Sequence, residues 1–268
     1  MQGRQTWQTF INIPGFYPRG CMKVSILIPA YNEEATIREL ISRVQAVDLR
    51  LLGFTKELIV IDDGSKDRTV SLVKTIPGVR LVVHKKNRGK GAAIRTGIKY
   101  ATGDVVLIQD ADLEYNPQEY PVLLKPFLER RTKVVYGSRF LSQIQKQKNI
   151  QFLQSKKMIK AKHDNAYTLA YFGGRFLTFL TNLLYNAKIT DEATGYKVFD
   201  AKVLKSIPLK CTKFEFCPEV TAKVRKRGYR IKEVPISYKP RTFEEGKKIR
   251  WKDGIHAIWT LLKYRFVN

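Results

Sequence analysis

Two carboxylates one residue apart, Asp110 and Asp112, directly follow a short apolar run at residues 105–108. A run of this composition is typical of a strand buried on both faces, as in a parallel sheet. Ligands of open α/β sheets bind just beyond the carboxyl ends of the strands. Two carboxylates there can hold a divalent cation, and Mg²⁺ typically takes one or two carboxylates plus substrate phosphates. The competing interpretation is a polar loop that caps the next helix, because D-x-D is short and common.

Other apolar runs are also followed by polar clusters, and helical spacing of apolar residues separates the runs. The clusters are Tyr31-Asn32-Glu33, Asp62-Asp63 and Ser138-Arg139. This alternation predicts right-handed βαβ units, and therefore an α/β fold with a doubly wound, mostly parallel sheet flanked by helices. All four clusters then converge on one crevice at one edge of the sheet. Taken alone each cluster is weak evidence, since Asp-Asp-Gly-Ser is more often a turn.

The chain reads as one principal domain over residues 22–240. Prolines and glycines within residues 1–21 predict an irregular N-terminal extension. Residues 241–268 form a basic segment that ends in an expected amphipathic helix. Five apolar residues share one stripe of that helix: Trp251, Ile255, Ile258, Trp259 and Leu262.

The net charge is the outlier of the composition, at +25 from 49 Lys+Arg and 24 Asp+Glu. Such a surface attracts nucleic acid, anionic lipid headgroups or phosphorylated substrates. The three cysteines have no metal-ligand spacing, and their odd number argues against a disulfide framework, which favours a reducing cytosol. No apolar stretch approaches the roughly 18 residues of a spanning helix, so we expect a chain that does not insert in a membrane by itself but can lie on one.

Four motifs, in chain order, resemble those of family 2 inverting glycosyltransferases. They are Ile-Pro-Ala-Tyr-Asn-Glu-Glu at 28–34, Ile-Asp-Asp-Gly-Ser-Lys-Asp at 61–67, Asn-Arg-Gly-Lys-Gly at 87–91 and Gln-Asp-Ala-Asp at 109–112. The closer resemblance is to polyprenyl-phosphate hexosyltransferases of the dolichol-phosphate mannose synthase and dolichyl-phosphate glucosyltransferase type. It extends over about residues 23–260 without large gaps. It implies a GT-A fold, a GDP- or UDP-sugar donor, Mg²⁺ or Mn²⁺, and transfer of mannose or glucose to a polyprenyl or dolichyl phosphate.

The resemblance also implies roles for residues on the donor side. Those expected along the nucleotide sugar are Pro29, Tyr31, Glu33, Asp62, Asp63, Lys90 and Asp110. Asp62 would contact the base or ribose. Tyr31 could equally be a packed aromatic side chain at the end of a strand. Asp112 would be the main metal ligand beside Asp110, with Glu114 where some relatives use Gln as a further ligand. The cation would neutralise the departing nucleoside diphosphate.

On the acceptor side, Arg139 and Arg241 match family positions thought to bind the acceptor phosphate, and Asp191 matches a recurrent acidic position nearby. A guanidinium can hold two phosphate oxygens at once. A phosphate is already nucleophilic, so in-line attack with inversion needs orientation more than a base. If the acceptor were instead a sugar hydroxyl in polysaccharide or glycolipid synthesis, a base would be required, and Asp191 is the candidate.

The distribution of basic residues also indicates where in the cell the protein acts. Between Lys205 and Lys252 there are 15 Lys/Arg against 5 Asp/Glu, and residues 146–162 are rich in lysine. These stretches suggest a face that lies on an anionic membrane, although a charge run is usually only a solvated surface. We therefore expect a cytoplasmic protein, peripheral on the inner face of the membrane, with room for a membrane-protein partner.

Two further alternatives belong to other classes of protein. A sugar-phosphate nucleotidyltransferase would need a glycine-rich basic loop after the first strand, where residues 29–34 are acidic instead. A nucleic-acid-binding protein would explain the charge, but it predicts no acidic pocket. Carboxylates at successive strand ends oppose that reading, so no nucleic acid partner is expected.

Overall fold

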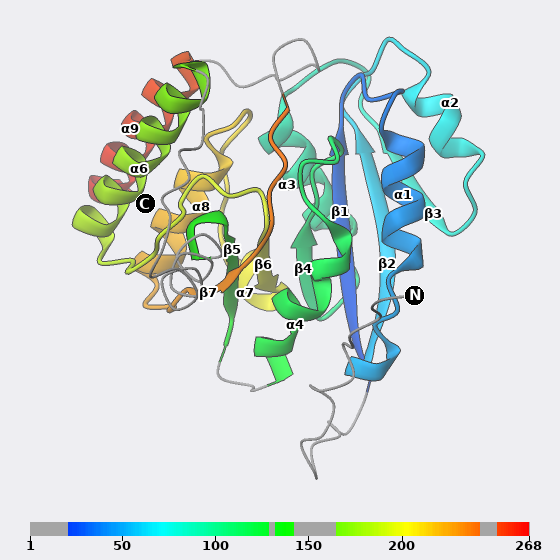
Figure 1. Cartoon of the computed structure of the whole chain (residues 1–268), viewed down its shortest axis with the longest axis horizontal. Coiled ribbons are helices and arrows are strands. Elements are labelled where there is room, and N and C mark those ends of the chain that lie inside the picture. The colour runs from blue at the N-terminus through cyan, green and yellow to red at the C-terminus, as the bar shows by residue number, and fades with distance from the viewer. Residues whose placement is uncertain (1–20, 129–131, 142–164, 242–250, 268) are drawn as a thin grey trace, which may run out of the picture.

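A seven-stranded sheet with the order β3-β2-β1-β4-β6-β5-β7 organises the chain (Figure 1). The computed structural model describes residues 21–128, 132–141, 165–241 and 251–267. The strands are β1 (Met22–Ala30), β2 (Phe54–Asp62), β3 (Val79–Val83), β4 (Val105–Ile108), β5 (Val134–Ser138), β6 (Lys197–Asp200) and β7 (Lys232–Pro235). Strands β1 to β4 pair in parallel, as do β5 and β7, whereas β6 runs antiparallel to both of its neighbours. The mostly parallel, doubly wound sheet predicted from the sequence is confirmed.

Helices cover both faces of this sheet. They are α1 (Ile37–Ala46), α2 (Thr69–Lys74), α3 (Lys90–Tyr100), α4 (Tyr120–Leu128), α6 (Asn165–Tyr185), α7 (Ala201–Ser206), α8 (Phe216–Lys226) and α9 (Trp251–Phe266), with 3-10 turns η2 (Arg50–Leu52) and η3 (Pro117–Glu119). Helices α1 and α4 share one buried cluster with β1, and α3, α7 and α8 share another. Strand β1 feeds both clusters, because Ile26 and Ile28 point to one face and Leu27 to the other.

The order of the strands reverses between β1 and β4. The chain moves outward from β1 to β3 and then returns to place β4 on the other side of β1. Crevices of open α/β sheets form at such a reversal. Strands β1 and β2 end in register, with Ala30 opposite Asp62, so the polar residues that follow them begin at the same edge.

A third, smaller core joins α6, α8 and α9 at the far side of the molecule from β1 to β3 (Figure 1). Leu177, Ala222 and Leu261 are buried there, and the Tyr185 hydroxyl donates to the Leu261 carbonyl at 2.5 Å. The helix expected at the C-terminus is therefore present and packs on the main domain. Most of its predicted apolar stripe faces outward, however: Trp251 is 70% exposed and Trp259 is 65% exposed, whereas Ile258 packs against this core.

Several expectations fall outside the described residues. They concern the extension predicted at 1–21, of which only Cys21 is described, the lysine-rich stretch at 146–162, and residues 242–250 of the basic C-terminal segment. Within the described part of the chain, no helix combines the length and the apolar character that crossing a membrane would need.

Candidate active site

Asp62, at the end of β2, is wholly buried and leaves one oxygen unpaired. Its Oδ1 accepts hydrogen bonds from the backbone N–H groups of Gly64 (3.1 Å) and Ser65 (2.9 Å). Its Oδ2 has no hydrogen-bond partner among the described residues. A buried carboxylate oxygen without a donor is costly, which makes this atom a natural acceptor for a ligand N–H or O–H.

Asp63 directs its carboxylate to the protein's own basic loop. It accepts from the backbone N–H groups of Arg88 (3.0 Å) and Gly89 (2.6 Å), and it lies 2.7 Å from His84 Nδ1. The other ring nitrogen of His84 lies 2.9 Å from Thr96 Oγ1. These contacts give Asp63 a positioning role in the loop before α3. No spacing pattern singled out His84, since its partners are brought together only by the sheet.

The same loop places Lys90 beside Asp110, one of the two predicted metal ligands. Gly89 has a φ of +93°, and a Cβ there would lie 2.3 Å from the Thr212 carbonyl oxygen, so only glycine suits this position. Lys90 Nζ lies 2.6 Å from Asp110 Oδ1. Burial alone would lower the pKa of Lys90, but the surrounding negative groups, above all the Asp110 carboxylate, outweigh that effect and the pKa is raised. Lys90 and Asp110, predicted to share the donor site, are therefore in direct contact.

Arg241 bridges two of the predicted carboxylates from the opposite end of the chain. Its Nη2 lies 3.3 Å from Asp112 Oδ2, and its Nη1 lies 3.4 Å from Glu33 Oε2. The structure thus brings the cluster after β1 and the cluster after β4 to one place. Pro29, opposite Ile61 in the sheet, is buried at the end of β1.

Burial first, and then the negative charges of Asp110 and Glu114, raise the pKa of Asp112 to about 7. Arg241 and Lys90 offset this only in part. Carboxylates crowded in this way favour an added cation, and their oxygen chemistry suits Mg²⁺ or Mn²⁺.

The carboxylate of Glu114 is engaged by other groups of the protein. Its Oε2 accepts from the Tyr238 hydroxyl at 2.9 Å, and its Oε1 accepts from the Arg241 backbone N–H at 2.8 Å. Across the described ranges, no three His, Cys, Asp or Glu side chains are close enough to hold one metal ion. The predicted three-carboxylate set is therefore not assembled, and Glu114 instead anchors the segment that carries Arg241.

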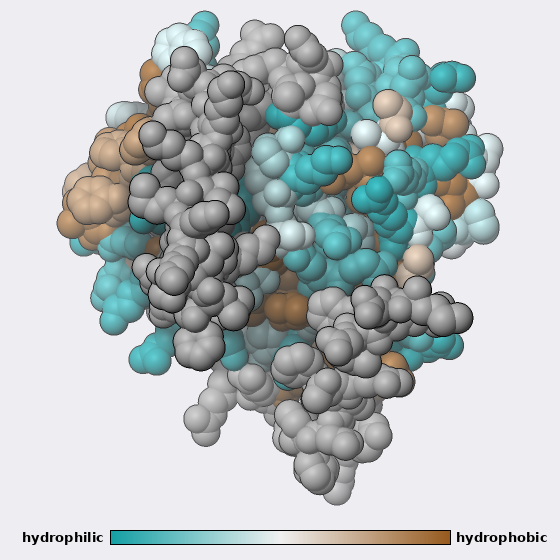
Figure 2. All heavy atoms as spheres, in the orientation of Figure 1, coloured by the Kyte–Doolittle hydropathy of each residue, from teal (hydrophilic) through white to brown (hydrophobic). Residues whose placement is uncertain are grey.

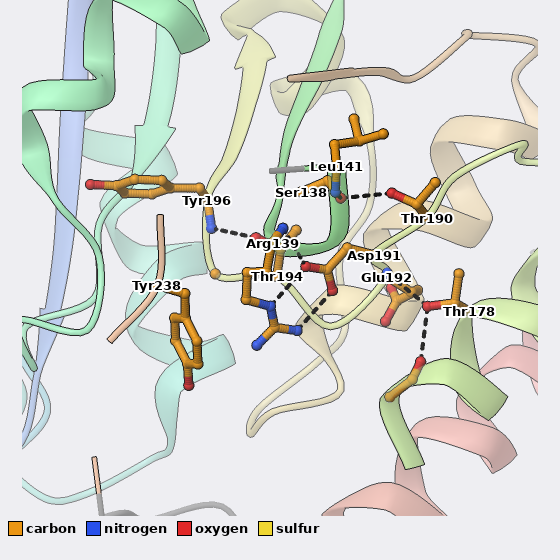
Figure 3. Close-up of polar contacts among 12 residues, drawn as sticks. Ser138, Arg139, Leu141, Thr178, Thr190, Asp191, Glu192, Thr194, Tyr196 and Tyr238 are labelled. Atoms are coloured by element: carbon orange, nitrogen blue, oxygen red, sulfur yellow. Dashed lines mark hydrogen bonds and ion pairs between the residues drawn. The ribbon is translucent and has the colours of Figure 1, made fainter. Parts of the chain in front are cut away.

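Arg139 and Asp191 form a bidentate ion pair at the end of β5 (Figure 3). Asp191 Oδ2 accepts from Arg139 Nε at 2.7 Å and from its backbone N–H at 3.0 Å, and Oδ1 accepts from Nη2 at 2.7 Å. The guanidinium also lies over the Tyr238 ring, 4.9 Å from its centroid. The backbone N–H of Asp191 in turn donates to Glu233 at 3.0 Å. Asp191 is thus an orienting partner of Arg139, and to act as a base it would have to leave this pair.

Glu192 lies beside this pair with little to stabilise its charge. Its Oε1 accepts from the Thr221 hydroxyl at 3.1 Å, whereas its Oε2 has no partner in the described part of the chain. Burial raises the pKa of Glu192 to about 7, although nearby Lys197 opposes the shift. The Lys197 ammonium itself donates to the Glu192 carbonyl at 2.7 Å and lies over the Tyr136 ring.

Comparison with known proteins agrees with this arrangement. The family described as Glycosyl transferase family 2 matches residues 25–207, and the chain belongs to that family. It is a glycosyltransferase, as the motifs predicted.

The chain is similar to two relatives in sequence and to one solved structure in fold. A dolichol-phosphate mannosyltransferase of Pyrococcus furiosus is 28% identical over 249 residues, which are 91% of this chain and 64% of the relative. A UDP-N-acetylglucosamine–dolichyl-phosphate N-acetylglucosaminyltransferase of Methanococcus voltae is 28% identical over 234 residues, 80% of this chain and 84% of the relative. The fold is similar to that of glucosyl-3-phosphoglycerate synthase from Mycobacterium tuberculosis, solved with Mn²⁺, UDP and phosphoglyceric acid. That match has a TM-score of 0.64 and 21% identity, and it covers 92% of this chain and 80% of the other.

Proposed function

We propose that this glycosyltransferase moves a hexose, mannose or glucose, from a GDP- or UDP-sugar to a polyprenyl or dolichyl phosphate. The observation that carries the proposal is the meeting of Asp110 and Asp112 with Lys90 and Arg241 at the reversal of the sheet. That cluster combines metal-binding carboxylates with cations suited to phosphate oxygens. The named relatives act on dolichyl phosphate, which supports this class of acceptor.

The donor half of the proposal rests on the ends of β1, β2 and β4. The unpaired Asp62 oxygen suits an N–H or O–H of the base or ribose. Pro29 lies at the end of β1, Tyr31 and Glu33 follow that strand, and Asp63 holds the loop that presents Lys90. A lysine there can meet a diphosphate oxygen as a point charge.

Asp110 and Asp112 would hold Mg²⁺ or Mn²⁺. A bound divalent cation supplies neutralisation of the charge that develops on the departing diphosphate. The Mycobacterium tuberculosis structure with Mn²⁺ and UDP supports a metal of this kind. Before it binds, Lys90 and Arg241 partly neutralise the two carboxylates.

On the acceptor side, an oxygen of the lipid phosphate attacks the anomeric carbon as the bond to the nucleoside diphosphate breaks. The electron pair of that bond leaves with the nucleoside diphosphate, and the configuration is inverted. Arg139 and Arg241 orient the acceptor phosphate, and Asp191 holds Arg139 in place through two hydrogen bonds. The site is less suited to a sugar-hydroxyl acceptor, because the candidate base Asp191 is already in an ion pair with Arg139.

The lipid acceptor implies work at a membrane. We propose peripheral association with the inner face of an anionic membrane, where the +25 charge favours binding. A membrane-protein partner is compatible with this location.

The experiment that tests the function offers a panel of GDP- and UDP-sugars with polyprenyl phosphate and Mn²⁺, and follows sugar in the lipid phase. Transfer of one hexose to lipid is expected. Transfer to a sugar hydroxyl, with none to polyprenyl phosphate, would overturn the proposed acceptor.

A further inference from the structure

Two neighbouring helices present large apolar side chains to the outside. We call these nine residues the outer apolar face: Phe172, Phe176, Phe179 and Leu183 of α6, and Trp251, Ile255, Trp259, Leu262 and Phe266 of α9. Their exposed fractions range from 38% at Leu262 to 86% at Phe266. Nine of the fourteen large apolar residues that are exposed in the described part of the chain lie on these two helices. Figure 2 shows hydrophobic side chains at the edge of the molecule where α6 and α9 lie.

The spacing of these residues makes the face continuous along each helix. On both helices they recur every three or four residues, which is one stripe of an α-helix. The opposite stripe of α9 is already occupied, because Ala257, Leu261 and Tyr264 are buried against α6 and α8. An amphipathic helix normally buries its larger apolar residues. In α9 the large tryptophans are exposed instead, which indicates that this surface binds another molecule.

The charges around the outer apolar face indicate what kind of partner covers it. The exposed basic residues Lys252, Lys263 and Arg265 lie on α9, whereas Arg175 of α6 donates to the Thr190 carbonyl at 3.4 Å on the inner side of that helix. Asp253 is the single acidic residue within 165–185 and 251–266. Aromatic and aliphatic side chains flanked by Lys and Arg are typical of helices that lie in the interface of an anionic bilayer. Tryptophan also prefers the level of the lipid headgroups. A second copy of this chain would bring an equally basic surface against the first, which disfavours a homodimer here.

The inner side of α6 contacts the segment that carries the acceptor-side ion pair. The Thr178 hydroxyl accepts from the Glu192 backbone N–H at 3.1 Å (Figure 3). Asn182 donates to the Ile189 carbonyl at 2.8 Å and accepts from its N–H at 2.9 Å. Asp191 lies within this segment and holds Arg139. The outer apolar face and the ion pair are thus on opposite sides of one helix, which is about 10–12 Å thick with its side chains.

We propose that the outer apolar face of α6 and α9 lies in the headgroup region of an anionic bilayer and brings Arg139 to the level of a lipid phosphate. The proposal rests on the function proposed above for its acceptor. It assigns membrane contact to two described helices, whereas the sequence pointed to the basic stretches at 146–162 and 205–252.

Vesicle co-sedimentation of the full chain tests the proposal. The probes are vesicles of phosphatidylcholine with about a third phosphatidylglycerol, and vesicles of phosphatidylcholine alone. The test variant carries Phe176→Ser, Phe179→Ser and Trp259→Ser, and the matched control carries Leu51→Ser, an exposed apolar residue elsewhere (79% exposed). Since burying one such side chain favours binding about tenfold or more, the triple variant should partition at least a hundredfold less into anionic vesicles. The control should bind like the wild type.

Two further readouts separate the possible outcomes. Circular dichroism and melting should be unchanged in the triple variant, because these side chains lie outside the core. With a short, water-soluble isoprenyl phosphate the variant should transfer sugar like the wild type, whereas transfer to long-chain acceptor in vesicles should fall at least tenfold. Undiminished vesicle binding by the triple variant would overturn the proposal, as would a wild-type dimer that the substitutions convert to monomer. Absence of transfer by the wild type to either acceptor would overturn the proposed function while the vesicle result still stood.

Discussion

Arg241 Nη2 lies 3.3 Å from Asp112 Oδ2, although 129 residues separate them in the chain. The contact joins the end of β4 to the segment after β7, and Glu114 strengthens it by accepting from the Arg241 backbone N–H. The Arg241 Nε is buried without a partner in the described part of the chain. An arginine held in this way can partly neutralise Asp112 before substrates arrive and can meet a phosphate when they do.

Substitution of Asp191 should impair the acceptor side alone. Asp191→Asn keeps the shape of the side chain but removes the charge that holds Arg139 through two side-chain hydrogen bonds. We expect kcat/KM for polyprenyl phosphate to fall about a hundredfold, because the guanidinium is no longer positioned. Nucleotide affinity, measured by calorimetry, should stay within about twofold of wild type. Turnover near the wild-type rate would contradict a role for this pair.

His84 should matter for stability and for nucleotide binding. In His84→Ala the buried Asp63 carboxylate loses one of its partners, which should cost about 1–3 kcal/mol in the free energy of unfolding. The loop that presents Lys90 should then be less well ordered, and UDP or GDP should bind more weakly. Urea unfolding and calorimetry measure the two effects. His256→Ala is the control, because that side chain is exposed on α9, and equal effects of both substitutions would refute the positioning role.

Glycine at position 89 should be irreplaceable. Gly89→Ala adds a Cβ that would meet the Thr212 carbonyl at a φ of +93°. We expect the loop to shift, with a loss of about 1–3 kcal/mol in stability and weaker nucleotide binding. Gly254→Ala is the matched control: its Cβ meets nothing within 4 Å in α9, and helix propensity predicts a gain of up to about 1 kcal/mol. Thermal melting compares them, and an unchanged melting temperature for Gly89→Ala would show that the loop tolerates the side chain.

Stability should fall as pH rises because of Glu192. Burial raises its pKa from an ordinary value of 4.5 to about 7, so the folded state binds more protons than the unfolded state between these values. The free energy of unfolding should therefore decrease from about pH 4.5 to pH 7, by a few kcal/mol. Glu192→Gln cannot titrate and should lack this slope, so the variant should be the more stable protein at pH 8. Parallel urea titrations at pH 5 and pH 8 measure the difference, and identical pH dependence in both proteins would exclude Glu192 as its source.

The sequence predicted the fold well where the signal was local. Apolar runs predicted β1, β2, β4 and β5, and the polar residues that follow these runs do lie at the ends of those strands. The reversed direction of β6 was not predicted, because a strand with only two apolar residues, Val198 and Phe199, carries no information about its orientation.

The roles of individual side chains were less predictable, because distant contacts decide them. Glu114 is a plausible metal ligand in the sequence, but Tyr238 and Arg241 engage it from more than 120 residues away. Asp63 likewise turns to His84 and the basic loop. The amphipathic pattern of α9 also has two apolar stripes, and only the packing against α6 and α8 decides that Leu261 is buried and Trp259 is exposed.

The most direct test of the account is the effect of Asp112→Asn on Mn²⁺-dependent nucleotide binding, measured by calorimetry with UDP and GDP, together with hexose transfer to polyprenyl phosphate. The account predicts that the variant loses at least tenfold in Mn²⁺-dependent affinity and at least a hundredfold in transfer, while its melting temperature is not lowered. Wild-type affinity and wild-type transfer in Asp112→Asn would contradict the claim that the carboxylates after β4 hold the cation of a glycosyltransferase.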